Sequence, residues 1–272
     1  MNHIKTMKIN VIKKLNKQYA IFGLLWGVLF SCSSLANEDL AKFNQHNSQF
    51  KTLFQCNKSF RYNIFLGGIK AGSLQRKIIW QNNTAIIHAQ GNVKILGIGS
   101  TYTQTSNLHW SEKNKHFYTD NFTQIIKGLD SRNMTAKITN NGTSSDVILD
   151  NEKSQYSTKK YPLYDLDTLG EQLRLELIKG TKIINLYRQA SDQIKHYQFK
   201  VIGKETIKVK PWGKIETIRL NEIGDHKGTV LWFSPSNNYQ LLKAKIDAFI
   251  TPVITLTAFN SECEQKNILD NY

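Results

Sequence analysis

The chain has 272 residues, a formal net charge of +15 at pH 7 and 40% hydrophobic residues, with only four prolines and sixteen glycines. This composition excludes a long flexible linker or a low-complexity tail, and the length allows one large domain with a buried core. The positive charge suits anionic lipid head groups or lipopolysaccharide as partners, although it also simply keeps a protein soluble.

The first 36 residues have the pattern of a secretory signal. Five lysines form a basic head, residues 19–30 are almost entirely apolar, and Ser34-Leu35-Ala36 has small residues at both ends. The apolar run is too short to span a membrane as a helix. We therefore predict cleavage after Ala36 and a mature protein that begins at Asn37 in the periplasm of a Gram-negative envelope.

Two other interpretations of this segment stay open. It could remain as an uncleaved membrane anchor, or Leu29-Phe30-Ser31-Cys32 could act as a lipoprotein box, with a lipid on Cys32 at the outer membrane. In either case the chain faces an oxidising space, and we expect no nucleic-acid partner. Cleavage would remove five lysines and no acidic residue, which lowers the net charge from +15 to +10.

Two cysteines remain once the signal is removed, Cys56 near the start of the mature chain and Cys263 near its end. Two cysteines in an oxidising compartment usually pair, so we predict a disulfide between them. Closing a loop of about 200 residues would contribute roughly 4–5 kcal/mol. The alternative of a catalytic thiolate has no supporting pattern around either cysteine.

Residues 37–57 are polar and mixed, and we interpret them as a leader that packs through a few apolar side chains: Leu40, Phe43, Phe50 and Phe54. From residue 58 to 263 we predict a single β-rich domain, followed by a tail at 264–272. Short runs rich in Ile, Val, Thr, Tyr and Phe alternate there with Gly, Asn and Asp, which is typical of antiparallel strands. The predicted strands are 60–66, 71–80, 84–90, 100–110, 116–127, 131–139, 144–149, 182–189, 194–202, 205–210, 214–223, 229–234, 239–249 and 252–259.

One segment has helical rather than strand periodicity. Thr168 and Glu171 have the spacing of a capping box, and Gly180 stands where a C-terminal cap belongs. An apolar residue recurs every four positions, at Leu169, Leu173 and Leu177. We predict a helix over residues 168–179 that packs on the sheet, with a partner-binding helix as the rival interpretation.

These elements predict a mainly β fold. We expect a strongly curved antiparallel sheet or open barrel of roughly a dozen strands with one packed α-helix. A hairpin turn is expected at Asn140-Asn141-Gly142, because Asn-Gly adopts positive φ at low cost.

Four motifs together resemble the bacterial family labelled "domain of unknown function 3108", a set of exported proteins. The motifs are Phe60-Arg61-Tyr62-Asn63-Ile64 with Gly68-Ile69-Lys70-Ala71-Gly72; Tyr164-Asp165-Leu166-Asp167-Thr168-Leu169 with Gln172-Leu173-Arg174; Lys210-Pro211-Trp212-Gly213 with Thr217-Ile218-Arg219-Leu220; and Leu231-Trp232-Phe233-Ser234-Pro235 with Tyr239 and Lys243-Ala244-Lys245-Ile246. The resemblance covers about residues 58–260. It implies an exported β-rich protein and transfers no activity or catalytic residue.

Catalytic and metal-binding patterns are not evident in the sequence. The histidines lie on separate runs, so we expect no metal site and no cofactor, although His109 and His116 flank a turn and could approach each other. Asp165 and Asp167 could pair as general acid and base. Their place at a helix start is better explained by carboxylates that complement the helix dipole.

The mature tryptophans offer a candidate ligand site. Trp80, Trp110 and Trp232 lie in predicted strands, where core packing is the default, but they could instead line a cavity for an acyl chain. Our leading hypothesis is a non-catalytic envelope protein, membrane-peripheral at most, that binds a lipid or another envelope component. The alternatives are an assembly protein that acts through protein–protein contacts and, third, a hydrolase of envelope polymers.

Overall fold

The computed structural model describes residues 53–95, 97–128, 131–224, 228–247 and 251–262. Several predicted features lie outside the described residues: the signal segment with Cys32, most of the leader, His226, Cys263 and the tail at 264–272. Among the described residues, no helix combines the length and the apolar character needed to cross a bilayer.

Strands account for most of the described residues. They are β1 (Lys58–Leu66), β2 (Ile69–Gln81), β3 (Thr84–Ile95), β4 (Ile98–Ser111), β5 (His116–Gly128), β6 (Arg132–Thr139), β7 (Ser144–Leu149), β8 (Glu152–Ser157), β9 (Leu163–Tyr164), β10 (Ile183–Gln189), β11 (Ile194–Val209), β12 (Gly213–Glu222), β13 (Val230–Ser234), β14 (Gln240–Lys245) and β15 (Pro252–Ser261). Helix α2 (Leu166–Ile178) separates β9 from β10, and a short 3-10 helix, η1 (Pro235–Asn237), follows β13.

The described strands form one 15-stranded sheet in the order β8-β7-β6-β5-β4-β3-β2-β1-β15-β14-β13-β12-β11-β10-β9. Neighbours are antiparallel except β9 and β10, which run parallel. The two halves of the chain are therefore two meanders that join where β1 pairs with β15. Because β8 and β9 are free edges, the sheet does not close into a barrel. The predicted fold class, mainly β with a strongly curved sheet and one packed helix, is confirmed.

Alternating burial explains why these segments form strands. In β6, Met134, Ala136 and Ile138 are buried, whereas Thr135 and Lys137 between them are exposed. Successive side chains of a strand point to opposite faces, so one face of β6 enters the core and the other meets solvent.

The hairpin turn after β6 follows the sequence prediction. Asn140, Asn141 and Gly142 all have positive φ, at 53°, 53° and 86°. Asparagine and glycine adopt this backbone conformation at low cost, which is why the chain reverses at this point.

The strand predictions differ from the structure in several places, and β3 runs to Ile95, five residues beyond its predicted end at 90. β11 runs unbroken through residues 203 and 204, where two strands were predicted, because Gly203 with φ of 141° takes up a register shift opposite β12. β8 and β9 were not predicted, since β8 is polar and almost wholly exposed and β9 has two residues. β14 ends at Lys245, before the predicted end at 249.

Helix α2 has the predicted C-terminus. Lys179 is the C-cap, and Gly180 follows with φ of 78°. The backbone N–H of Gly180 donates to the Leu177 carbonyl, and that of Thr181 to the Glu176 carbonyl, both at 3.0 Å. This double closure is a Schellman motif, which needs a residue in the left-handed region and so selects glycine.

The predicted capping box is wrong. Helix α2 begins two residues earlier than expected, and the N-cap is Asp165 rather than Thr168. The Asp165 carboxylate accepts hydrogen bonds from the backbone N–H groups of Asp167 at 2.7 Å and Thr168 at 3.2 Å. Glu171 does not return to the helix start, because its carboxylate pairs with arginine side chains.

Asp165 also joins the helix to the sheet. Ser106 and Gln104 of β4 donate to one carboxylate oxygen at 2.8 and 3.0 Å, and Thr119 of β5 donates to the other at 2.9 Å. Asp165 is completely buried. Its burial is tolerated because both oxygens are saturated with donors.

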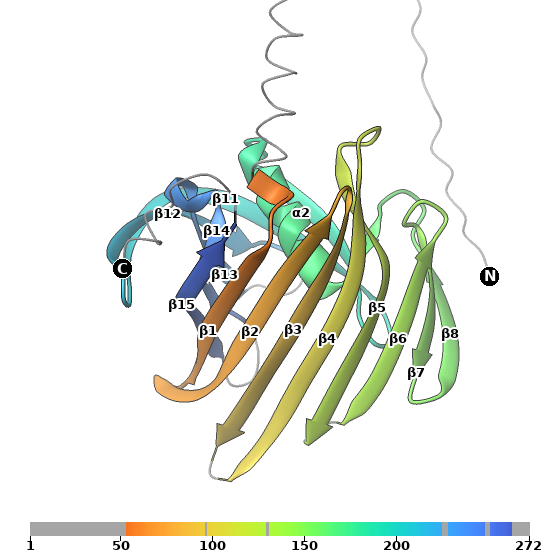
Figure 1. Ribbon diagram of the computed structural model, residues 1–272, viewed down its shortest axis with the longest axis horizontal. Coiled ribbons are helices and arrows are strands. Elements are labelled where there is room, and N and C mark those ends of the chain that lie inside the picture. The colour runs from red at the N-terminus through yellow and green to blue at the C-terminus, as the bar shows by residue number, and fades with distance from the viewer. Residues whose placement is uncertain (1–52, 96, 129–130, 225–227, 248–250, 263–272) are drawn as a thin grey trace, which may run out of the picture. The chain divides into compact units, whose positions relative to one another are not determined.

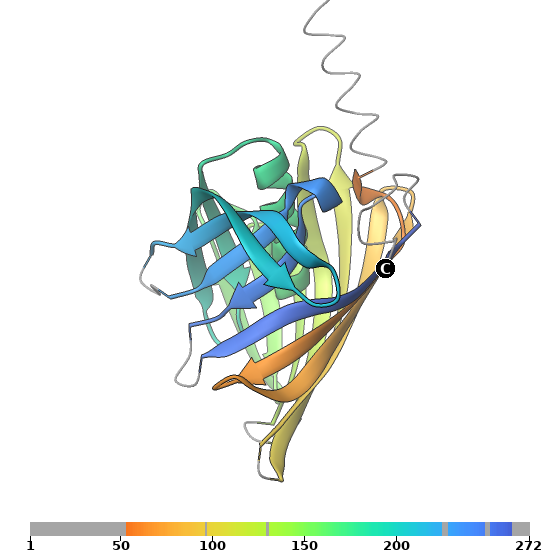
Figure 2. The same ribbon diagram turned by 90° about the vertical axis from the view of Figure 1, so that its left-hand side faces the viewer.

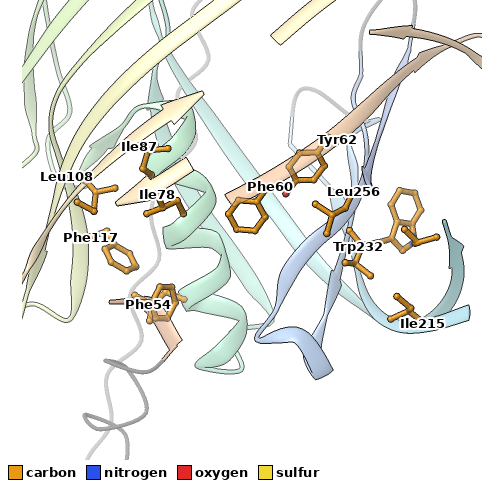
Figure 3. Close-up of a cluster of buried hydrophobic side chains, with 14 of the residues drawn as sticks. Phe54, Phe60, Tyr62, Ile78, Ile87, Leu108, Phe117, Ile215, Trp232 and Leu256 are labelled. Atoms are coloured by element: carbon orange, nitrogen blue, oxygen red, sulfur yellow. The ribbon is translucent and has the colours of Figure 1, made fainter. Parts of the chain in front are cut away.

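The curved sheet wraps around α2, which contacts β4 and β5 from one meander and β9 and β10 from the other (Figure 1; Figure 2). The predicted stripe of Leu169, Leu173 and Leu177 packs on the β10–β14 side. The largest hydrophobic cluster extends from Phe54 and Phe117 across the sheet to Trp232 (Figure 3). The helix thus lies inside the fold with both flanks covered.

Replacing Asp165 with alanine tests its role as the junction. Asp165→Ala would leave two helix N–H groups and three strand side chains without their acceptor. We expect the free energy of unfolding, measured by urea denaturation, to fall by about 3 kcal/mol or more. Asp192→Ala, at an exposed aspartate, is the control and should change it by less than about 0.5 kcal/mol. Equal effects of the two substitutions would contradict this assignment.

Candidate functional site

A cavity of about 370 Å³ lies between α2 and the sheet. The helix contributes Leu169 and Leu173, and the sheet contributes Phe199 of β11 together with Leu231 and Phe233 of β13. The other lining residues include further aliphatic and aromatic side chains, together with charged residues of α2, β2 and β10. A concave, mainly apolar space of this size is typical of small-molecule binding sites.

Strand periodicity places these side chains on the cavity wall. Leu231 and Phe233 are two residues apart in β13 and therefore share one face. Tyr197 and Phe199 do the same in β11, and their aromatic planes lie parallel with centroids 6.2 Å apart. The alternation of β11 was visible in the sequence, but it could not distinguish a core face from a cavity wall.

A glycine on the helix keeps part of the cavity open. Gly170 lines the cavity, and a Cβ atom built on it would have no atom within 4 Å apart from its chain neighbours and the backbone of its own helix. Glycine in a helix interior costs roughly 0.5–1 kcal/mol relative to alanine. A larger residue at this position would therefore extend into the cavity.

The cavity reaches the surface at the start of α2. Leu166, the first residue of the helix, lines the cavity and is 46% exposed. Leu173, two turns further along, is 2% exposed. An apolar ligand could therefore enter beside Leu166 and extend inward along the helix.

A buried ionic network flanks the cavity. Arg76 of β2 donates through Nε to Asp167 at 2.8 Å, through Nη1 to Glu171 at 2.9 Å and through Nη2 to the Asp167 carbonyl at 3.0 Å. All three nitrogens of this guanidinium are therefore occupied by the first two turns of α2. The geometry fixes the helix relative to β2.

Arg174 extends the network on the next helix turn. Its guanidinium donates to Glu171 at 3.2 Å and to the backbone carbonyls of Asn238 and Leu53 at 2.6 and 2.7 Å. It also lies over the Phe54 ring, 4.2 Å from the centroid. Arg174 is 2% exposed, so these partners rather than water stabilise its positive charge.

Lys58 is the third buried cation beside the helix. Its ammonium donates to the carbonyls of Leu53 and Phe54 at 2.8 and 3.3 Å. Burial, followed by the positive charge of Arg174, holds the pKa of Lys58 well below its ordinary value.

The two carboxylates bound by Arg76 have opposite pKa shifts. Burial raises the pKa of Asp167 to about 6 because Arg76 only partly offsets the lost hydration, and the Asp165 charge acts in the same direction as burial. Burial would also raise the pKa of Glu171, but the charges of Arg76, Arg174 and Lys58 lower it to about 2. Arg76 therefore serves chiefly as the counter-ion of Glu171.

The network has a structural rather than a catalytic arrangement. Gln104 donates to both Asp165 and Asp167, at 3.0 and 2.9 Å, which keeps the two carboxyl groups in fixed positions. Asp165 is completely buried, and both carboxylate oxygens of Asp167, which lines the cavity, accept hydrogen bonds from Arg76 and Gln104. In the described part of the chain, no three histidine, cysteine, aspartate or glutamate side chains gather into a metal-binding group.

The tryptophans predicted to line a cavity lie elsewhere. Trp110 and Trp232 are buried in the largest hydrophobic cluster, and Trp80 packs against it. None of the three is among the residues that line the 370 Å³ cavity. Its aromatic residues are Tyr62, Tyr197, Phe199 and Phe233. Sequence reasoning missed them because tryptophan content says nothing about which strands face the helix.

His109 and His116, which the sequence placed on either side of a turn, have different partners. His109 bonds to Asp120 at 2.7 Å, whereas His116 lies beside Gln172 at 2.8 Å. His116 and Glu176 share a second hollow of about 660 Å³, but Gln172 bridges them. Among the described residues, His116 bonds to no serine, threonine or cysteine, so the hydrolase interpretation gains no geometric support there.

The raised pKa of Asp167 makes stability depend on pH. Its folded-state pKa of about 6 exceeds the ordinary 3.8, so the folded state binds this proton more tightly. The stability contribution is present in full below the ordinary pKa and is lost as pH rises through the folded value. The shift corresponds to about 3 kcal/mol.

Asp167→Asn resembles the protonated carboxyl and should remove this dependence. We expect the wild-type free energy of unfolding, relative to the variant, to fall by up to about 3 kcal/mol from about pH 4 to about pH 7. Urea denaturation across this range measures the difference, with Asp192→Asn as the control. A difference that stays constant or grows with pH would overturn the assignment.

Comparison with known proteins adds one match. A family model described as "Protein of unknown function (DUF3108)" matches residues 61–257. No curated protein and no solved structure matches the chain.

Proposed function

Because the chain belongs to the DUF3108 family, whose description names no activity, we propose from its own residues that it is an exported, non-catalytic protein that binds a lipid. The observation that supports this proposal is the apolar cavity beside α2, which opens to the surface at Leu166 and has no side chain filling it at Gly170. Its ligand is an amphiphile whose chain lies along the helix.

Hydrophobic energetics support an acyl chain as the occupant. Each methylene moved from water to an apolar site contributes roughly 0.8 kcal/mol. Leucine and phenylalanine walls offer such a site, whereas an empty apolar space loses packing contacts. The saturated carboxylates around α2 support binding without catalysis.

The compartment is the second part of the proposal. The signal pattern at residues 1–36 supports export to the periplasm, and the basic mature charge supports a peripheral approach to anionic lipid or lipopolysaccharide. An exported lipid-binding protein would move or sense an envelope component.

Filling the space at Gly170 tests the ligand site. The space around a Cβ atom at Gly170 is open, so Gly170→Leu should extend a side chain toward the cavity, while Gly170→Ala strengthens the helix and leaves most of the space open. We expect native mass spectrometry with lipid extraction to find a lipid of defined mass on the wild type and on Gly170→Ala. Gly170→Leu should carry none, although its melting temperature should not fall.

An uncharged fluorescent probe, N-phenyl-1-naphthylamine, provides a second readout on delipidated protein. It should bind the wild type and Gly170→Ala, and at least about tenfold more weakly to Gly170→Leu. If all three proteins bound the probe equally well, the cavity beside Gly170 would not be the ligand site. An apo mass with no probe binding would redirect the search to protein–protein assembly.

The predicted disulfide tests the compartment. Cys263 lies outside the described residues, but the strand register approaches it: Asn57 accepts from the Glu262 backbone N–H at 2.9 Å, and Lys58 pairs with Ser261. Cys56 precedes Asn57, and Cys263 follows Glu262. These neighbours support a bond between the two cysteines.

We expect no titratable thiol in mature protein that is purified from cells under non-reducing conditions and then denatured. Reduction should release both Cys56 and Cys263, which mass spectrometry after alkylation would identify, with an N-terminus at Asn37. Free thiols before reduction would contradict the pairing. A Cys56→Ser variant should then label at Cys263 without reduction.

A further inference from the structure

Three arginines line the cavity, and they differ in their partners. Arg76 and Arg174 form ion pairs with carboxylates of α2 at 2.8 to 3.2 Å. Arg188 of β10 forms no ion pair with any residue that the structure describes, although it borders the same space.

The hydrogen bonds of Arg188 are incomplete. Its Nη1 donates to the Tyr197 hydroxyl at 3.4 Å, which is a long contact. Its Nε is buried and has no acceptor within the described residues. A buried donor on a charged group costs free energy unless an acceptor is supplied, so this nitrogen indicates a missing partner.

Neither cross-strand neighbour of Arg188 is acidic, and the Asp167 carboxylate that lines the same cavity is already bound by Arg76 and Gln104. Register places Arg188 opposite Lys195 of β11 on one side and Tyr164 of β9 on the other. A basic residue opposite an arginine raises the local positive potential, and an anion would relieve it.

Arg188 lies at the open end of the cavity. Tyr164, its partner in register, is two residues before Leu166, the exposed residue at the cavity mouth. A ligand chain that runs inward along α2 would therefore leave its polar end near Arg188.

We propose that Arg188 binds the anionic head group of the amphiphile, a carboxylate or a phosphate, while the chain occupies the apolar cavity. This assignment rests on the proposed function. A guanidinium can form two parallel bonds to either head group, and these bonds are stronger than those to a neutral hydroxyl. Arg76 and Arg174 cannot take this role because their nitrogens are already bound to α2 and to carbonyl groups.

The test compares dodecanoate, dodecyl phosphate, dodecanol and inorganic phosphate as competitors of N-phenyl-1-naphthylamine on delipidated protein. We expect the wild type to bind both anionic amphiphiles at least about tenfold tighter than the alcohol. Arg188→Met should reduce the ratio of anionic-amphiphile affinity to dodecanol affinity to near one. Its affinity for dodecanol should stay within about threefold of the wild-type value, since methionine keeps the apolar contact. Arg188→Lys should retain part of the ratio, and Arg61→Met, at an exposed arginine on β1, should retain all of it.

The outcomes separate the two proposals. Equal binding of dodecanoate and dodecanol to the wild type, or an unchanged ratio in Arg188→Met, would overturn the role of Arg188 and keep the lipid cavity. Inorganic phosphate that binds as tightly as dodecyl phosphate would identify a free-anion site and also overturn it. If none of the amphiphiles displaces the probe, the proposed function itself fails.

Discussion

The arrangement of helix and sheet depends on the hydrogen bonds that the buried Asp165 carboxylate accepts. This carboxylate caps the backbone of α2 and accepts from side chains of β4 and β5, so the helix start and two strands share one buried charge. A group with no exposed surface can remain there only while its donors stay in place. The position of α2, and with it every space beside the helix, follows from this constraint.

The ionic network determines which charged side chains beside α2 have an ion-pair partner and which do not. Arg76 pairs with Asp167 and Glu171, and Arg174 pairs with Glu171, so both guanidinium groups have carboxylate partners next to the apolar wall. Removing one partner of such a buried pair would leave an uncompensated charge, so these side chains are bound to their structural role. Arg188, in contrast, forms no ion pair with any described residue, and its buried Nε has no hydrogen-bond acceptor among them.

Local patterns allowed much of the fold to be predicted. Period-two alternation marked the long strands, and the leucine spacing with Gly180 marked the end of α2. Thr168 looked like the cap because the sequence shows only neighbours along the chain, whereas Ser106 and Thr119 reach Asp165 from distant strands. The cavity was not predictable for the same reason, since its walls come from both meanders.

The pairing of β1 with β15 has a consequence for how the molecule assembles. Each meander contains hairpins between consecutive strands, which can form as soon as their residues meet. The two meanders join in the sheet through the first and last strands, and Asn57 and Glu262 beside this junction are 205 positions apart. Because the paired residues are so far apart in the sequence, most of the entropy cost of closing the chain falls on the step in which β1 pairs with β15. A chain emerging from its N-terminus would hold β1 unpaired on one side until β15 has been synthesised, so during that interval this edge needs protection from other chains.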